Sequence, residues 1–157
     1  LAVAACSKSE NAGGGVKREA GNWTTDVKLV KFEVPGMPDK MKAGMSEMLE
    51  GASGMDQCLT QAQVDKEDIA AELAKGPGNG GECTWTKKDI AGGKIDIAGT
   101  CTANGQQVEM AMTGTMEAKK SDVTITTKGK VPTGGDMEMV MQMTSPPPGP
   151  CKAPATT

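Results

Sequence analysis

Sulfur-bearing side chains carry most of the chemistry that this sequence could perform. Its 157 residues include 5 cysteines and 12 methionines but no histidine and no tyrosine. Without histidine the chain lacks the commonest metal ligand and the commonest general base, so it cannot build an internal Ser-His-Asp or Cys-His site. The chemistry that remains is disulfide formation, lipidation of a cysteine, and coordination of a soft metal ion by thioethers.

The first cysteine, Cys6, lies in a context typical of lipidation. It follows a short apolar run, 1–5, that ends in small residues, as secretory signals do. The order Val3-Ala4-Ala5-Cys6 resembles a bacterial lipobox, whose cysteine is lipidated and becomes the mature N-terminus. We therefore expect residues 1–6 to be a signal-peptide remnant that ends in the lipobox cysteine. Ser7 follows in place of Asp, which for such signals implies the outer membrane. The alternative is an ordinary free cysteine.

The remaining cysteines are even in number and can close two disulfides, in any of three connectivities. They are Cys58, Cys83, Cys101 and Cys151. A hairpin whose three-residue loop is 91–93 places Cys83 directly opposite Cys101, close enough for a bridge. Cys58 is then left for Cys151. We expect these two disulfides, and with them an oxidising compartment.

Several methionines recur at every second residue and so share one face of a strand. The candidates for a thioether site that suits Cu(I) are Met110, Met112, Met139 and Met141. These positions have the same parity as Ile97 and Ile125, which a metal would not use. We therefore predict that the four methionines are apolar core residues, and we expect no metal and no cofactor. A Met-rich, copper-handling periplasmic protein is the alternative.

The segment 83–143 supplies the strands that must position these side chains. Apolar and polar residues alternate along it, which is the pattern of half-buried antiparallel strands. Turn signals separate the strands at Gly92-Gly93, Asn104-Gly105, Lys119-Lys120 and Pro132–Gly135.

These turns predict a register for each hairpin. The first turn pairs Lys88 with Asp96, and the second pairs Ile97 with Met112. The third pairs Met116 with Val123 and Gly114 with Ile125. Each pairing keeps the apolar face continuous.

The chain before this segment predicts one strand and two helices. The strand is 22–34, with a change of face at Leu29-Val30 that indicates a bulge. The first helix is 38–50, with an apolar stripe of Met41, Met45, Met48 and Leu49. The second runs from a capping box at Thr60 to Lys75, with Ile69 and Leu73 as its apolar pair.

The predicted fold class is α+β. It is mainly an antiparallel β-meander of about six strands in a curved sheet, with two helices inserted between strands 1 and 2 and packed on the sheet. We expect a flexible tether at 7–21, a single domain at 22–151 and a disordered tail at 152–157. The proline-rich stretch 145–151 is predicted to be an extended strap.

Composition excludes several classes of function. With a net charge of −3, the chain has no basic surface for nucleic acid. The glycine-rich stretch 76–81 lacks the Lys-Ser/Thr of a phosphate loop and does not follow a strand. Asp89 and Asp96 lie near one hairpin end, where paired carboxylates are usually a solvated rim. We therefore expect no enzyme.

Several short motifs together resemble the DUF3617 family. They are Gly21 shortly before Trp23, Cys58-Leu59-Thr60, Cys83-Thr84, Gly99-Thr100-Cys101 and Gly149-Pro150-Cys151. Members are small exported proteobacterial proteins with no established function. The resemblance covers about residues 21–151 and implies the fold and an exported location, but no catalytic residues. One departure is Pro146–Pro148, where members often carry an aromatic residue.

These observations lead to one functional expectation. We expect a non-enzymatic lipoprotein on the periplasmic side of the bacterial cell envelope, anchored to the outer membrane through Cys6. Its partner would be an apolar ligand or another envelope protein.

Overall fold

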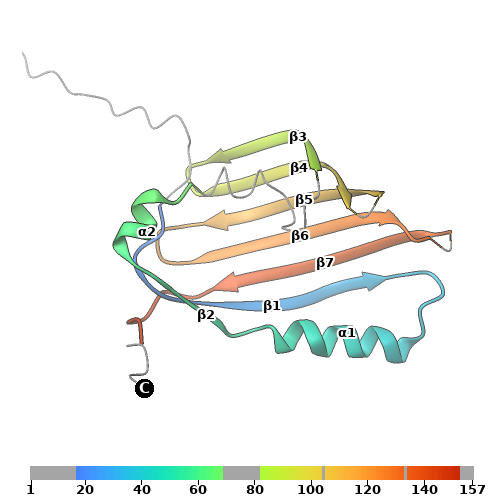
Figure 1. Ribbon diagram of the computed structural model, residues 1–157, viewed down its shortest axis with the longest axis horizontal. Helices are drawn as coiled ribbons and strands as arrows, with labels where there is room; N and C mark the ends of the chain where they lie inside the picture. Colours follow the sequence, from blue (N-terminus) through green and yellow to red (C-terminus); the bar gives the residue numbers. More distant parts are fainter. Residues whose placement is uncertain (1–16, 69–81, 104, 133, 153–157) are drawn as a thin grey trace, which may run out of the picture.

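Seven antiparallel strands form a single sheet in the computed structural model, which describes residues 17–68, 82–103, 105–132 and 134–152. The strand order is β2-β1-β7-β6-β5-β4-β3 (Figure 1). The strands are β1 (Gly21–Glu33), β2 (Met55–Leu59), β3 (Glu82–Ala91), β4 (Lys94–Ala103), β5 (Gln106–Met116), β6 (Ser121–Lys130) and β7 (Asp136–Ser145). The helices are α1 (Asp39–Gly51) and α2 (Gln61–Lys66). The predicted α+β meander is confirmed, with seven strands in place of about six.

The additional strand is β2, which lies between the two helices and pairs with β1 at the edge of the sheet. Its residues are exposed except Leu59, so the short segment carries no alternating pattern that could have predicted a strand. The turn before it is fastened to β1 by a hydrogen bond from Gly54 N to Thr25 O, at 2.9 Å.

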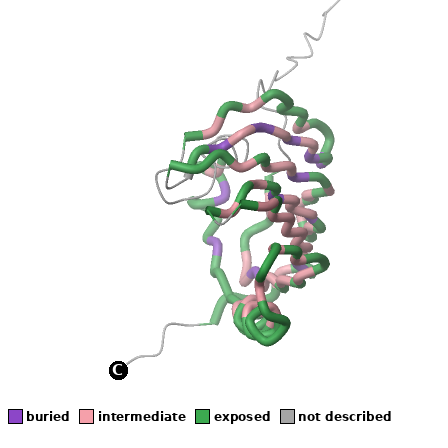
Figure 2. The backbone as a smooth tube through the Cα atoms, turned by 90° about the vertical axis from the view of Figure 1, so that its right-hand side faces the viewer, coloured by how far each residue is buried: buried purple, intermediate pink, exposed green. Residues whose placement is uncertain are grey.

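Helix α1 lies along the outer edge of the sheet, beside β1 (Figures 1 and 2). Pro38 is its N-cap, and none of its residues is buried. Met45 and Leu49 are half-buried, while Met41 and Met48 are exposed. The expected apolar stripe is therefore only partly covered, because the helix contacts an edge of the sheet and not its apolar face.

Helix α2 begins in the predicted capping box. The Thr60 hydroxyl accepts from Gln63 N at 3.3 Å, and the Gln63 side chain accepts from Thr60 N at 2.8 Å. The helix ends at Lys66, because Glu67 has an extended backbone. It is therefore shorter than the predicted helix to Lys75, and the expected apolar pair Ile69 and Leu73 lies outside the described residues.

The hairpin of β3 and β4 keeps the predicted register at one end and loses it at the other. Cys83 faces Cys101 and Trp85 faces Gly99, as expected. The register then shifts by one residue between Trp85 and Lys87, so the predicted pairing of Lys88 with Asp96 is wrong. The turn has two residues, Gly92 and Gly93, both with positive φ, where a three-residue loop was predicted. The bulge after Trp85 takes up the one-residue difference, so Cys83 still faces Cys101.

The hairpin of β5 and β6 turns one residue earlier than predicted. Met116 faces Ser121 and Gly114 faces Val123, so the predicted partners Val123 and Ile125 are wrong by two residues. Glu117 N donates to Lys120 O at 2.8 Å, which centres the turn on residues 118–119. A shift of two residues leaves the apolar face intact. The register of β4 with β5 and the bulge of β1 after Leu29 are as predicted.

Buried residues form two clusters on the apolar face. The larger cluster lies on β4, β5 and β6 and contains Ile95, Ile97, Met112 and Val123. The smaller lies at the end of the sheet near α2 and contains Trp23, Leu59 and Val64. Cys101 and Thr127 are buried on the same face outside these clusters, and the methionines of β7 are half-buried.

Candidate functional site

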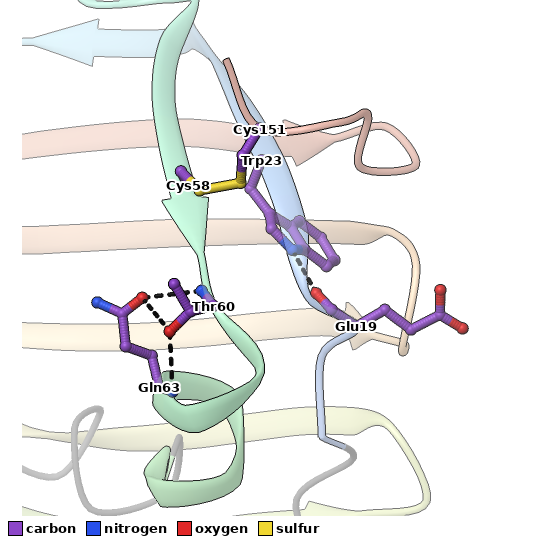
Figure 3. Close-up of a disulfide and its surroundings, with 6 residues drawn as sticks. All are labelled: Glu19, Trp23, Cys58, Thr60, Gln63 and Cys151. Atoms are coloured by element: carbon purple, nitrogen blue, oxygen red, sulfur yellow. Dashed lines mark hydrogen bonds between the residues drawn. A yellow bond between two sulfur atoms is a disulfide. The ribbon is translucent and has the colours of Figure 1, made fainter. Parts of the chain in front are cut away.

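Two disulfides fasten the sheet at its two edges. Cys83 and Cys101 join β3 to β4, with Cα atoms 4.0 Å apart. Cys58 joins β2 to Cys151 at the end of the C-terminal strap, with a Cα separation of 5.4 Å (Figure 3). Both pairs are as expected, the first from the hairpin register and the second as the two cysteines that remain. They indicate an oxidising compartment, since disulfides do not persist in a reducing cytosol.

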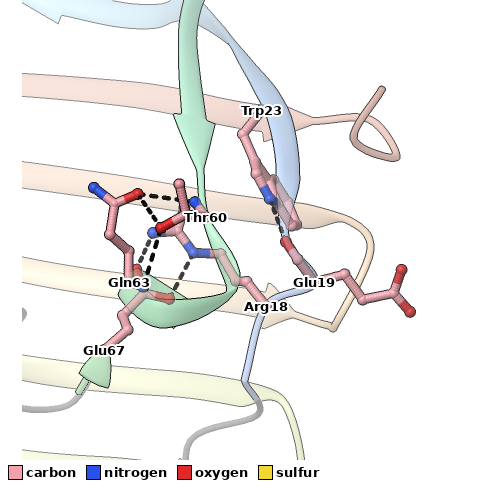
Figure 4. Close-up of polar contacts among 6 residues, drawn as sticks. All are labelled: Arg18, Glu19, Trp23, Thr60, Gln63 and Glu67. Atoms are coloured by element: carbon pink, nitrogen blue, oxygen red, sulfur yellow. Dashed lines mark hydrogen bonds and ion pairs between the residues drawn. The ribbon is translucent and has the colours of Figure 1, made fainter. Parts of the chain in front are cut away.

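Contacts around Trp23 join Arg18 and Glu19 to the end of α2, and we call this group of contacts the Trp23 clasp. The Trp23 indole N–H donates to Glu19 O at 2.9 Å, and the Arg18 guanidinium lies 5.3 Å from the ring centroid (Figures 3 and 4). Arg18 also makes a two-point ion pair with Glu67, just after α2. The folded part therefore includes Arg18 and Glu19, which lie within the segment expected to be a tether.

The carboxylate of Asp56 joins β2 to β1 and to the C-terminal strap. It accepts from the Thr24 hydroxyl at 2.7 Å and from Lys152 Nζ at 3.3 Å. These hydrogen bonds hold the pKa of Asp56 below its ordinary value of 3.8, and the bond from Thr24 has the larger effect. Asn22 N donates to Gly149 O at 2.8 Å, which completes the attachment of the strap.

The predicted thioether candidates all lie on the apolar face, but in two rows interrupted by β6. Met110 on β5 and Met139 on β7 both face Thr127, which lies between them. Met112 and Met141 are separated in the same way by Ile125.

The far ends of the two rows are apolar as well. Phe32 extends the Met139 row on β1, and Leu29 extends the Met141 row. The four methionines therefore share one face of the sheet, with Thr127 and Ile125 of β6 between them. Met112 is buried and the other three are half-buried.

A groove of about 790 Å³ opens where β5, β6 and β7 meet. Most of its walls are polar side chains from the opposite face of the sheet: Glu33, Thr100, Gln107, Glu109, Lys128, Lys130, Asp136 and Glu138. A second hollow of about 410 Å³ shares Thr100, Glu109 and Lys128 with it. Glu109 is exposed and Glu138 is half-buried. The alternation of polar and apolar residues carries no signal for this concavity.

Ion pairs occupy much of this groove. Lys31 Nζ lies 3.3 Å from the Glu33 carboxylate and 3.4 Å from that of Glu138. Hydrogen bonds to these two carboxylates raise the pKa of Lys31, and the bond to Glu33 has the larger effect. Lys130 lies 3.7 Å from Asp136. Such exposed pairs are what a solvated sheet surface normally carries.

The other candidate carboxylates are also at the surface. Asp89 and Asp96 face each other across β3 and β4, and Lys87 makes an ion pair with Asp96. This pair, through the hydrogen bond to Asp96, raises the pKa of Lys87. Within the described part of the chain, no three His, Cys, Asp or Glu side chains are grouped to hold a metal ion.

One sequence expectation and one structural finding concern the membrane. Cys6, the predicted lipidation site, lies outside the described residues. Among the helices that the structure describes, none is long and apolar enough to cross a bilayer.

The fold and its two edge disulfides define a disulfide-bonded β-meander protein whose sheet has one apolar face. The chain belongs to the DUF3617 family, whose members are described as proteins of unknown function and whose pattern matches residues 18–151. The match begins at Arg18 of the Trp23 clasp and ends at Cys151 of the strap disulfide. No curated protein and no solved structure matches the chain.

Proposed function

We propose that this protein is a non-enzymatic lipoprotein of the bacterial cell envelope that binds an apolar ligand on the methionine-bearing face of its sheet. In this proposal the lipidated Cys6 attaches it to the outer membrane from the periplasmic side. The ligand class is an acyl chain or a molecule of similar shape and polarity.

The observation that carries the proposal is the half-buried state of the apolar layer on β7 and β1. At the end near α2, Trp23, Leu59 and Val64 are buried. Farther along, Met139 and Met141 are only half-buried, and so are Leu29 and Phe32 opposite them. A contiguous apolar surface that is left partly exposed commonly marks a binding site. Methionine suits it, because its flexible side chain adapts to ligands of irregular shape.

Two further observations support the location. The disulfides are typical of an exported protein. They also use four of the five cysteines and leave Cys6 for a thioether-linked lipid. Two or more acyl chains on one cysteine would make membrane attachment stable, which a single chain does not.

Lipidation is tested by expressing the precursor in a Gram-negative host and following incorporation of radiolabelled palmitate. We expect label in the parent and none in Cys6→Ser. Equal labelling of the two proteins would contradict the anchor.

Ligand binding is tested by titrating the purified protein with the apolar fluorophore N-phenyl-1-naphthylamine. We expect Met139→Gln/Met141→Gln to weaken binding about tenfold or more, since burying one such side chain is worth about 1.5–3 kcal/mol. The matched control, Met139→Leu/Met141→Leu, keeps the apolar surface and should bind like the parent. Dye binding that is absent from the parent, or unchanged by the glutamines, would overturn the proposed site.

A further inference from the structure

The large hydrophobic side chains that the structure leaves most exposed gather at one side of the molecule. Among the described residues they are Val30, Met41, Met48 and Met55, with exposed fractions between 56% and 68%. They belong to β1, α1 and β2, three consecutive elements at one edge of the sheet (Figure 1). We call Met41, Met48 and Met55 the methionine edge.

The sequence of α1 arranges its polar residues around this edge. Met41 and Met48 are seven residues apart and lie on one side of the helix. Lys40 and Lys42 flank that side, one on each boundary of the apolar stripe. The carboxylates of Asp39, Glu47 and Glu50 fall on the remaining surface. Lys42 also lies 3.9 Å from the Asp39 carboxylate. Lysines at the boundary of an apolar stripe can extend toward lipid head groups while the stripe enters the interface.

Helix α1 lies beside the sheet (Figure 2), and hydrogen bonds to β1 hold the turn that follows it. Ser53, just after the helix, accepts from Val27 N at 2.9 Å and donates to Val27 O at 2.8 Å. In the same turn, Gly54 N donates to Thr25 O of β1. None of the residues of α1 is buried, so the exposed thioethers are not needed to complete the core.

We propose that the methionine edge docks on a lipid bilayer surface. The proposal rests on the lipid anchor of the proposed function, which would hold the domain at the membrane. From Cys6 to Lys17 the chain spans at most about 40 Å, using about 3.3–3.6 Å per residue. This is about the length of the 13-residue strand β1, so the anchored domain can lay this edge on the lipid.

The chemistry of the edge favours lipid over a protein partner. Its thioethers offer flexible apolar volume, and α1 carries three carboxylates against two ammonium groups. With a net negative charge, α1 is not attracted to anionic head groups, so insertion of apolar side chains must supply the affinity. Binding should accordingly not weaken as the salt concentration is raised.

Co-sedimentation with vesicles of phosphatidylethanolamine and phosphatidylglycerol tests the proposal. The full chain carries Cys6→Ser, so that no acyl chain contributes to binding. A negative result here does not bear on lipidation of Cys6, which the palmitate experiment tests separately. We expect the parent to co-sediment, and Met41→Gln/Met48→Gln/Met55→Gln to bind at least about tenfold more weakly. The matched control is Ala43→Gln, an exposed position away from the stripe.

Three outcomes would overturn the proposal. One is that the parent does not co-sediment. Another is that the triple variant, shown by circular dichroism to be folded, binds vesicles as well as the parent. The third is that the parent forms dimers which the triple variant loses, since the edge would then be covered by a second copy.

Discussion

Gly114 is the residue at which the backbone leaves the least room for a side chain. Its φ is +150°, and a Cβ there would lie 2.0 Å from Asp122 O in the neighbouring strand. We predict that Gly114→Ala destabilises the protein by more than about 4 kcal/mol, a cost reserved for severe steric conflicts. Urea unfolding followed by circular dichroism measures this.

Gly54 is the matched control, because its φ is +79° but no atom would lie within 4 Å of a Cβ. Gly54→Ala should cost only about 1–2 kcal/mol, the penalty for a left-handed conformation alone. If the two variants were equally stable, the close approach of β5 and β6 at Gly114 would be wrong.

The thioethers of β7 test whether sulfur chemistry or packing volume matters on the apolar face. Met139→Leu/Met141→Leu removes both sulfurs while nearly conserving volume, so each change should cost less than about 1.5 kcal/mol. We expect neither the parent nor the variant to bind Cu(I) tightly in a competition titration. Tight binding by the parent that the variant loses would make copper handling the leading function.

At the scale of elements, the two disulfides close loops of very different length. Cys83–Cys101 spans 18 residues and Cys58–Cys151 spans 93. In the chain-entropy account, replacing the first pair by serine should cost about 3 kcal/mol and the second about 4–5 kcal/mol. Chemical denaturation of the two double variants under non-reducing conditions compares them. A larger loss for the short loop would show that local packing outweighs loop entropy here.

The contact between β2, β1 and the strap should depend on pH through Asp56. Its pKa is lowered in the folded protein, chiefly by the Thr24 hydroxyl. The stabilisation is therefore fully present above the unfolded-state pKa and is lost as pH falls through the folded-state value. We expect Asp56→Asn to be less stable than the parent at neutral pH, with the difference shrinking in acid. Urea unfolding at neutral and acidic pH measures the difference in stability between parent and variant. A difference that does not change with pH would contradict this role.

The faces of the long strands were predictable except in β3 beyond Trp85, because a register shift of two residues leaves the alternation unchanged, whereas the bulge in β3 shifts it by one residue. The register of β4 with β5 was predictable, but that of β5 with β6 was not, since the hydrogen bond from Glu117 to Lys120 depends on local backbone geometry. The strand β2 was missed because its exposed residues do not alternate. The groove around Glu109 and Lys128 was missed because coiling of the sheet leaves no mark on alternation.

At the scale of the whole molecule, the chain is a single sheet held at both edges by covalent bonds. Its well-buried residues are few: eight hydrophobic side chains form the core of the described part. A layer this thin gains from disulfides, as small exported domains usually do. It also leaves apolar surface on β7 and β1 that a ligand could cover.

Native mass spectrometry of the protein extracted from a Gram-negative envelope in mild detergent tests the central claim most directly. We predict that the parent retains a non-covalent apolar molecule, that Met139→Leu/Met141→Leu retains it too, and that Met139→Gln/Met141→Gln loses it. A parent that carries no such molecule, or a glutamine variant that carries it undiminished, would contradict the account.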